Sequence, residues 1–141
     1  MSMIGQLWWG TVMLCICIVF HTAVVYFTLT WVKSLLHVFR NHHWSTVFVP
    51  VIALSCFSLI AGHTLQVWLW ATVLLQLGTL PNLELALYYA LVTYTTVGYG
   101  DVTLAQDYAI FGAFASVVGL FAFGISSAFL VGIVMRFLPR V

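Results

Sequence analysis

Three long apolar runs, each bounded by polar residues, dominate the pattern of the chain. They cover about residues 4–32, 47–76 and 107–138. A helix needs about 20 apolar residues to cross the hydrocarbon core of a bilayer. Each run is longer than that, so we expect helices that tilt or extend beyond the core. The pattern predicts an all-α membrane protein with three transmembrane helices.

The polar stretch after the first run predicts an amphipathic extension of the first helix. Lys33, His37 and Arg40 recur at helical spacing, with apolar residues on the opposite side. This arrangement is typical of a helix that lies at the membrane interface. We expect a turn over residues 41–46, with Ser45 or Thr46 as the N-cap of the next helix.

A shorter helix is predicted between the second and third runs. Gly78 and Pro81 end the preceding helix, Asn82 starts the next one, and Glu84 falls in its first turn, where a negative charge is favourable. The helical pattern covers about residues 83–95, which is too short to cross a bilayer. We therefore expect it to enter the membrane partway, and the next segment to return.

Composition and charge exclude several classes of protein. Hydrophobic residues make up 64% of the chain and charged residues only 5%, against about 45–50% and about 25% in soluble domains. The net charge of +1 gives no reason to expect a nucleic-acid partner. The three cysteines lie inside apolar runs and are typical of small buried hydrophobes. No carboxylate pair, nucleophile–base set or metal cluster converges, so an enzyme is not expected.

The positions of the charges predict the orientation. All four basic residues flank one side of the predicted membrane and all three acids the other: Lys33, Arg40, Arg136 and Arg140 against Glu84, Asp101 and Asp107. The positive-inside rule then places the 33–46 loop and the C-terminus in the cytoplasm. With three spans, the N-terminus is extracellular and the short helix enters from outside.

The returning segment, "TTVGYGD" at residues 95–101, has a backbone suited to holding a cation. Irregular backbone at membrane depth must be buried in protein or line a watery cavity. Gly98 and Gly100 permit positive φ, so successive carbonyls can turn the same way. Inward carbonyls without donors are costly, and a dehydrated cation would replace the missing donors. One such loop cannot encircle an ion, so several copies must surround it, with Val97 and Tyr99 pointing away from the axis.

The same segment resembles the signature of potassium channels. The resemblance covers about residues 47–138 and implies a pore domain over residues 47–141: outer helix 47–76, pore helix 83–95, filter 96–100 and inner helix 107–138. Residues 1–46 would be an extra N-terminal transmembrane helix and loop. The resemblance implies a homotetramer in the cell membrane, without a cofactor. K⁺ would be held by the carbonyls of Thr96, Val97, Gly98 and Tyr99 and by the Thr96 hydroxyl.

The resemblance also assigns residues around the filter. The stretch "PNLELALYYALVTYTTVGYGD" aligns without gaps on the pore helix of two-helix bacterial channels. Tyr88 and Tyr89 stand where many members carry a pair of tryptophans that brace the filter tyrosine. Pore helices that end near Thr95 would direct their partly negative C-termini at a central cavity and favour a cation there.

On the inner helix, the family register predicts both a hinge and a pore-facing surface. Gly119 and Gly124 resemble the paired glycines of the family, the first standing at its gating hinge. Close packing between helices is the alternative reading of both. The residues expected to face the pore and form a gate are Leu120, Phe123, Ser127, Val131 and Met135.

Two features depart from the family pattern. Val92 stands where some bacterial members have a buried glutamate that pairs with the aspartate after the filter, here Asp101. We therefore expect Asp101 to be stabilised by solvent or by a donor such as the Tyr88 hydroxyl. In addition, no helix carries an arginine at every third residue, so voltage sensing by that device is not expected.

The histidines fall into two groups. His37, His42 and His43 are expected in a solvated turn, with metal binding or pH sensing as the alternative. His21 and His63 lie within spans, where ionisable residues are often functional. We expect them to be neutral and hydrogen-bonded between helices, with His63, Thr64 and Gln66 contacting the pore helix or the first span.

Three other functions remain as alternatives to a potassium-selective channel. A less selective cation channel of the same fold would normally change the residue at Tyr99. A potassium transporter subunit usually carries four degenerate pore units in one chain, whereas this chain has one strict copy. An accessory membrane protein would have no reason to keep this filter.

Overall fold

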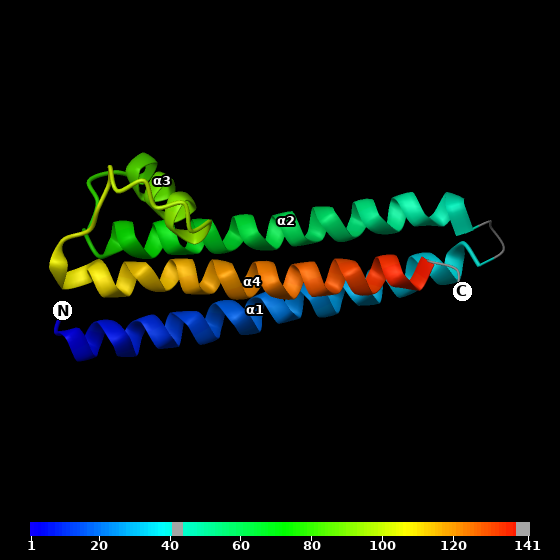
Figure 1. Cartoon of the computed structure of the whole chain (residues 1–141), viewed down its shortest axis with the longest axis horizontal. Coiled ribbons are helices and arrows are strands. Elements are labelled where there is room, and N and C mark those ends of the chain that lie inside the picture. Colours follow the sequence, from blue (N-terminus) through cyan, green and yellow to red (C-terminus); the bar gives the residue numbers. More distant parts are fainter. Residues whose placement is uncertain (41–43, 138–141) are drawn as a thin grey trace.

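Three long helices lie side by side, and a short fourth helix packs against two of them near one end (Figure 1). The computed structural model describes residues 1–40 and 44–137. The long helices are α1 (Met3–Val38), α2 (Trp44–Gln76) and α4 (Gln106–Phe137), and the short one is α3 (Leu83–Tyr94). All three long helices are long and apolar enough to cross a membrane. The expected all-α fold, with three long apolar helices and a short one, is confirmed.

Local capping explains where the helices around α3 end and begin. Gly78 adopts φ +66° after the last turn of α2. The Thr79 N–H donates to the Leu74 carbonyl (3.2 Å) and the Gly78 N–H to the Leu75 carbonyl (3.0 Å), which together form a Schellman motif. The Asn82 side chain then accepts from the Leu85 N–H (2.9 Å) as the N-cap of α3. The predicted stop and start are both confirmed.

The prediction for the start of α2 is wrong. This helix begins at Trp44, so Ser45 and Thr46 lie inside its first turn and neither is its N-cap. The residues before Trp44, including His42 and His43, lie outside the described part of the chain, and so does most of the predicted turn.

The predicted helical continuation of the first helix past residue 32 is confirmed as far as Val38, but Arg40, which was expected on the same helix, lies beyond its end. Helix α1 continues without a break to Val38 and includes Lys33 and His37, both of which are exposed.

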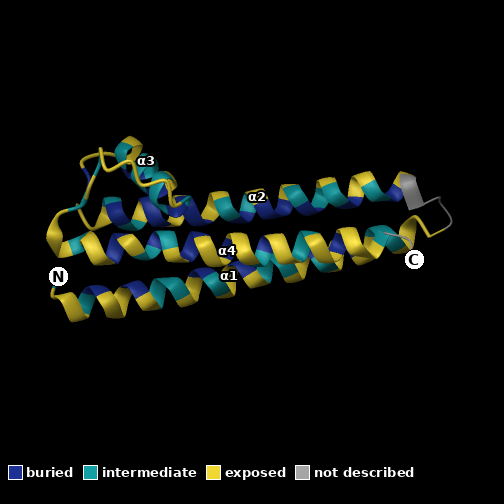
Figure 2. Cartoon of the chain, in the orientation of Figure 1, coloured by how far each residue is buried: buried dark blue, intermediate teal, exposed yellow. Residues whose placement is uncertain are grey.

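Two apolar clusters hold the long helices together, one toward each end of the bundle. The larger cluster lies beside α3 and includes Trp70, Leu74 and Tyr94. The smaller one lies near the opposite end and includes Val32, Val51 and Ile133. Buried polar side chains of α1, α2 and α4 lie between the two clusters along the chain, among them His21, Gln66 and Ser126. Figure 2 shows buried residues on the helix faces that meet one another and exposed residues on the outer faces.

The outer faces of the bundle are strongly apolar. Large aromatic side chains such as Trp8, Phe27, Phe57 and Phe121 are exposed on the chain. Surfaces of this kind are rare on soluble monomers and are typical of contact with lipid or with other subunits.

Candidate functional site

The backbone after α3 alternates between two conformations. Thr96, Gly98 and Gly100 have φ values of +62°, +55° and +79°, whereas Val97 and Tyr99 between them do not have positive φ. The two glycines behave as expected. Thr96 was not foreseen, because a β-branched residue rarely adopts positive φ and its presence there marks a strained position that the surrounding structure enforces.

This alternation turns the N–H groups of the segment toward α3. The N–H groups of Val97 and Gly98 both donate to the Val92 carbonyl, at 3.0 and 3.2 Å, and the Thr96 N–H donates to the Thr93 carbonyl at 2.9 Å. Alternating right- and left-handed residues form such a concave set of N–H groups. Among the described residues, no hydrogen bond reaches the carbonyls of residues 96–99. The segment therefore offers a row of oxygen acceptors.

The side chains of the segment are not covered by their own chain. Val97 is 52% exposed and Tyr99 73% exposed. The Thr95 hydroxyl instead turns back onto α3 and donates to the Leu91 carbonyl (2.8 Å).

Tyr88 and Tyr89 have different surroundings. The Tyr88 hydroxyl donates to an Asp101 carboxylate oxygen at 2.6 Å, which is the donor that the sequence suggested in place of an acid partner. This hydrogen bond lowers the pKa of Asp101 below its ordinary value of 3.8, because it stabilises the charged form. Tyr89 is half-buried and places its hydroxyl 2.6 Å from where a Cβ would stand on Gly112. It therefore packs against the start of α4.

Gly119 allows α3 and α4 to approach closely. A Cβ at this position would meet the Tyr94 carbonyl oxygen and lie 2.8 Å from its carbonyl carbon. Gly124 differs, since nothing lies within 4 Å of its Cβ position. Sequence analysis allowed two roles for these glycines, a gating hinge or close packing between helices. In this structure Gly119 is a site of close packing.

Most of the α4 residues that were expected to face the pore are not packed within the chain. Leu120, Gly124, Ser127, Val131 and Met135 are all exposed. A hollow of about 330 Å³ brings Leu120 together with Thr96 and Gly98, so this face of α4 lies beside the segment after α3. Phe123 lies to one side, with its ring stacked on that of His63 at a centroid distance of 4.4 Å.

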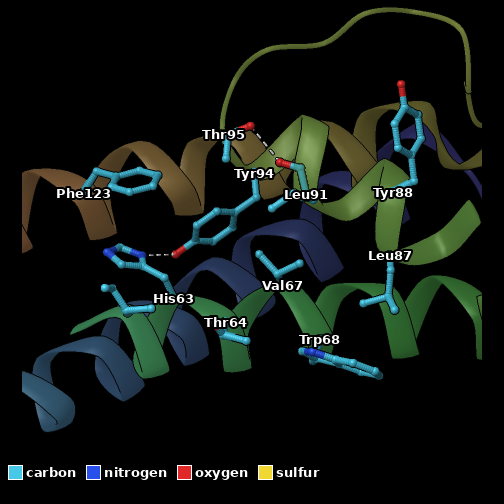
Figure 3. Close-up of a pocket in the computed structure, with 11 residues that line it drawn as sticks. His63, Thr64, Val67, Trp68, Leu87, Tyr88, Leu91, Tyr94, Thr95 and Phe123 are labelled. Atoms are coloured by element: carbon cyan, nitrogen blue, oxygen red, sulfur yellow. Dashed lines mark hydrogen bonds between the residues drawn. The ribbon is translucent and has the colours of Figure 1, made fainter. Parts of the chain in front are cut away.

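A second hollow, of about 450 Å³, lies between α2 and α3 and is closed at one end by Phe123 of α4. Figure 3 shows His63 and Tyr94 pointing toward each other from α2 and α3, with Phe123 beside them. His63 Nδ1 and the Tyr94 hydroxyl are 2.8 Å apart. Sequence reasoning expected a polar contact of His63, Thr64 and Gln66 with α3 or α1. It is confirmed for His63, which contacts α3, and for Gln66, which contacts α1, but not for Thr64. Thr64 lines the hollow.

Sequence reasoning did not identify Tyr94 and Ser126 as partners of these histidines. Tyr94 and His63 are 31 positions apart, and Ser126 and His21 are 105 apart. A serine within an apolar run was the available signal, but it does not say which helix its hydroxyl contacts. Within residues 1–40 and 44–137, no group of three His, Cys, Asp or Glu side chains could hold a metal ion.

A comparison with protein-family models matches residues 51–136 to the ion channel family. Comparisons with curated proteins and with solved structures return no match. The matched region is more than half of the chain and contains most of α2, all of α3 and nearly all of α4. The chain is therefore a multi-pass membrane protein that belongs to the ion channel family and is not an enzyme.

Proposed function

We propose that the chain is a potassium-selective channel in which residues 96–100 form the filter. The observation that carries this proposal is the backbone of residues 96–100. Every second residue of this segment has positive φ, and the carbonyls of residues 96–99 accept no hydrogen bond from the described residues. Carbonyl oxygens arranged in this way replace the hydration shell of K⁺. Thr96 adds its hydroxyl at the inner end.

The conducting unit of this proposal is a homotetramer. A single filter segment supplies carbonyls on one side of an ion only, so copies of the chain must complete the ring of oxygens. The exposed Val97 and Tyr99 side chains are then covered by neighbouring subunits. The end of α3 contributes as well, because its C-terminus carries partial negative charge that favours a cation in the cavity below.

The face of α4 that carries Leu120, Gly124, Ser127, Val131 and Met135 lines the pore in this proposal. At about 100° per residue these positions lie on one side of the helix. Phe123 stands at the edge of this face, against His63. Four copies of Val131 and Met135 would narrow the inner end of the pore and act as an apolar gate.

The proposed orientation places the filter at the extracellular end of the helix bundle. The amino group of Met1 lies 4.0 Å from an Asp107 carboxylate oxygen, so the N-terminus and the start of α4 share one end of the bundle. Lys33, Arg40 and Arg136 are near the other end. Arg140, also part of this argument, lies outside the described residues. The positive-inside rule then makes the C-terminus cytoplasmic.

Cation flux into liposomes that contain the purified protein tests the proposal. We expect K⁺ and Rb⁺ to enter and Na⁺ to be strongly excluded. Gly98→Ala places a side chain at φ +55° in the filter, and should abolish or degrade selective flux. Gly78→Ala is the matched control, since Gly78 has φ +66° and equal free space but lies outside the filter.

The Gly78→Ala variant should keep the ion preference of the native protein. Comparable Na⁺ and K⁺ flux in the native protein would refute selectivity. Chemical cross-linking that stops at dimers or trimers would refute the tetramer.

A further inference from the structure

Five side chains from all four helices form a closed ring of hydrogen bonds, which we call the polar ring. Starting from α2, Gln66 Nε2 lies 2.9 Å from His21 Nδ1 on α1, and His21 Nε2 lies 2.8 Å from the Ser126 hydroxyl on α4. Ser126 contacts His63 Nε2 at 3.0 Å, and His63 Nδ1 contacts the Tyr94 hydroxyl at 2.8 Å. The Tyr94 hydroxyl donates to Gln66 Oε1 at 3.3 Å and closes the ring.

The polar ring is complete only when both imidazoles are neutral. The Gln66 amide donates to His21, which then carries its proton on Nε2 and donates to Ser126. Ser126 donates to His63 Nε2, so His63 carries its proton on Nδ1 and donates to Tyr94. Each member thus donates once and accepts once within the ring. If the Gln66 amide is reversed, every donor and acceptor reverses too. In both cases the two histidines carry their protons on opposite ring nitrogens.

The polar ring holds the end of the pore helix. Tyr94 is the last residue of α3, and the filter segment starts two residues later. The Tyr94 hydroxyl is held by His63 and Gln66, while its carbonyl lies against Gly119. His63 also stacks on Phe123. The ring thereby connects α1, through His21, to the helix that carries the filter.

An added proton would break the polar ring. A protonated imidazole donates from both nitrogens. On His21 the new N–H would face the Gln66 amide donor. On His63 the new proton would occupy Nε2, so the Ser126 hydroxyl would lose the nitrogen to which it donates in the ring. The two imidazoles lie against each other, with ring centroids 4.7 Å apart, and Tyr94 of α3 contacts His63. Cys17 of α1 is the ionisable group beside Tyr94. Among the described residues, no carboxylate forms a hydrogen bond or an ion pair with either imidazole, so no negative charge compensates the proton.

We propose that the polar ring positions the end of the pore helix behind the filter, and that a proton taken up by His21 or His63 opens the ring and lowers conduction. This inference rests on the proposed channel function. It gives α1, which lies outside the region matched to the ion channel family, a role in conduction. The polar ring would also support the filter without the buried glutamate that some channels carry at the position of Val92.

Nitrogen NMR of ¹⁵N-histidine-labelled protein in lipid bilayers measures which imidazole nitrogens of the polar ring carry protons. This measurement does not depend on conduction. At neutral pH we expect one of the two histidines to be protonated on Nδ1 and the other on Nε2. Tyr94→Phe removes one hydroxyl of the ring and keeps the aromatic ring in place. His63 then has no partner at Nδ1, so it should carry its proton on Nε2, where the Ser126 hydroxyl can accept it.

Potassium flux into liposomes between pH 7.5 and pH 4.5, with equal pH on both sides of the membrane, measures how opening of the polar ring affects conduction. Loss of a buried hydrogen bond corresponds to about tenfold in an equilibrium constant, so Tyr94→Phe should lower neutral-pH flux by up to about tenfold. Native flux should fall toward the Tyr94→Phe level as the histidine signals titrate. Tyr26→Phe is the matched control, because it removes an exposed tyrosine hydroxyl of α1; it should follow the native profile.

The inference is overturned if the native histidines carry their protons on the same ring nitrogen at neutral pH. It is also overturned if the flux and pH profile of Tyr94→Phe coincide with those of the native protein. Any titration of Asp101 is common to the three proteins and cancels in their comparison. Because the nitrogen shifts do not depend on ion flow, failure of the polar ring and failure of the channel proposal are distinguishable.

Discussion

The contact between α3 and α4 at Gly119 makes a sharp test of the structure. Gly119→Ala would place a methyl group against the carbonyl of Tyr94, 2.8 Å from its carbon and 3.3 Å from Cδ1 of its ring. Two of these three atoms are backbone, at the C-terminal end of the pore helix. The backbone cannot rotate away as a flexible side chain would, so α3 must move away from α4.

The size of the effect follows from two opposing terms. Extra atoms in a well-packed interface destabilise a protein by about 1–3 kcal/mol. Alanine in place of glycine within a helix contributes about 1 kcal/mol in the opposite direction. Gly124→Ala provides the second term alone, because nothing lies within 4 Å of its Cβ position. The helix term cancels in the difference between the two variants, and we expect Gly119→Ala to be less stable than Gly124→Ala by about 1–3 kcal/mol.

Thermal unfolding of the purified variants in detergent micelles measures this difference, and potassium flux measures its effect on the filter. Gly119→Ala should unfold at lower temperature than the native protein and conduct less, whereas Gly124→Ala should be at least as stable as native. Equal stability of the two variants would refute the close approach of α3 and α4. A change in gating at Gly119→Ala without loss of stability would instead support a hinge at this position.

Three further predictions concern the filter, the gate and the orientation. The Tyr88 hydroxyl holds the pKa of Asp101 below 3.8. The stabilisation from the charged carboxylate is therefore complete above that pH and is lost as the pH falls through the lowered pKa. Tyr88→Phe should move the acid-induced loss of current to higher external pH, and an unshifted acid response would contradict this. Val131→Ser should raise the open probability in bilayer recordings by making the inner end of the pore easier to wet; an unchanged open probability would remove Val131 from the gate. Ser2→Cys, in a background without the native cysteines, should react with an impermeant thiol reagent added outside cells, and labelling only after lysis would reverse the proposed orientation.

The sequence alone determined the helices and several of their ends, because these depend on local chemistry. The lengths of the apolar runs predicted α1, α2 and α4, and Gly78 and Asn82 marked the end of α2 and the start of α3. The filter glycines predicted positive φ, since only glycine adopts it freely. The start of α2 was predicted wrongly at Ser45 or Thr46, because a residue type that suits an N-cap does not by itself fix where a helix begins.

The tertiary structure decided which residues meet, and no local pattern carries that information. Thr96 adopts positive φ against the preference of a β-branched residue, while the N–H groups on either side of its carbonyl bind back to the pore helix. Gly119 acts as a contact point because Tyr94 lies against it. The polar ring depends on side chains up to 105 positions apart. A buried polar group needs a hydrogen-bond partner, so the sequence could predict that His21 and His63 would be hydrogen-bonded. Only the packing of four helices determined that Ser126 and Tyr94 are their partners.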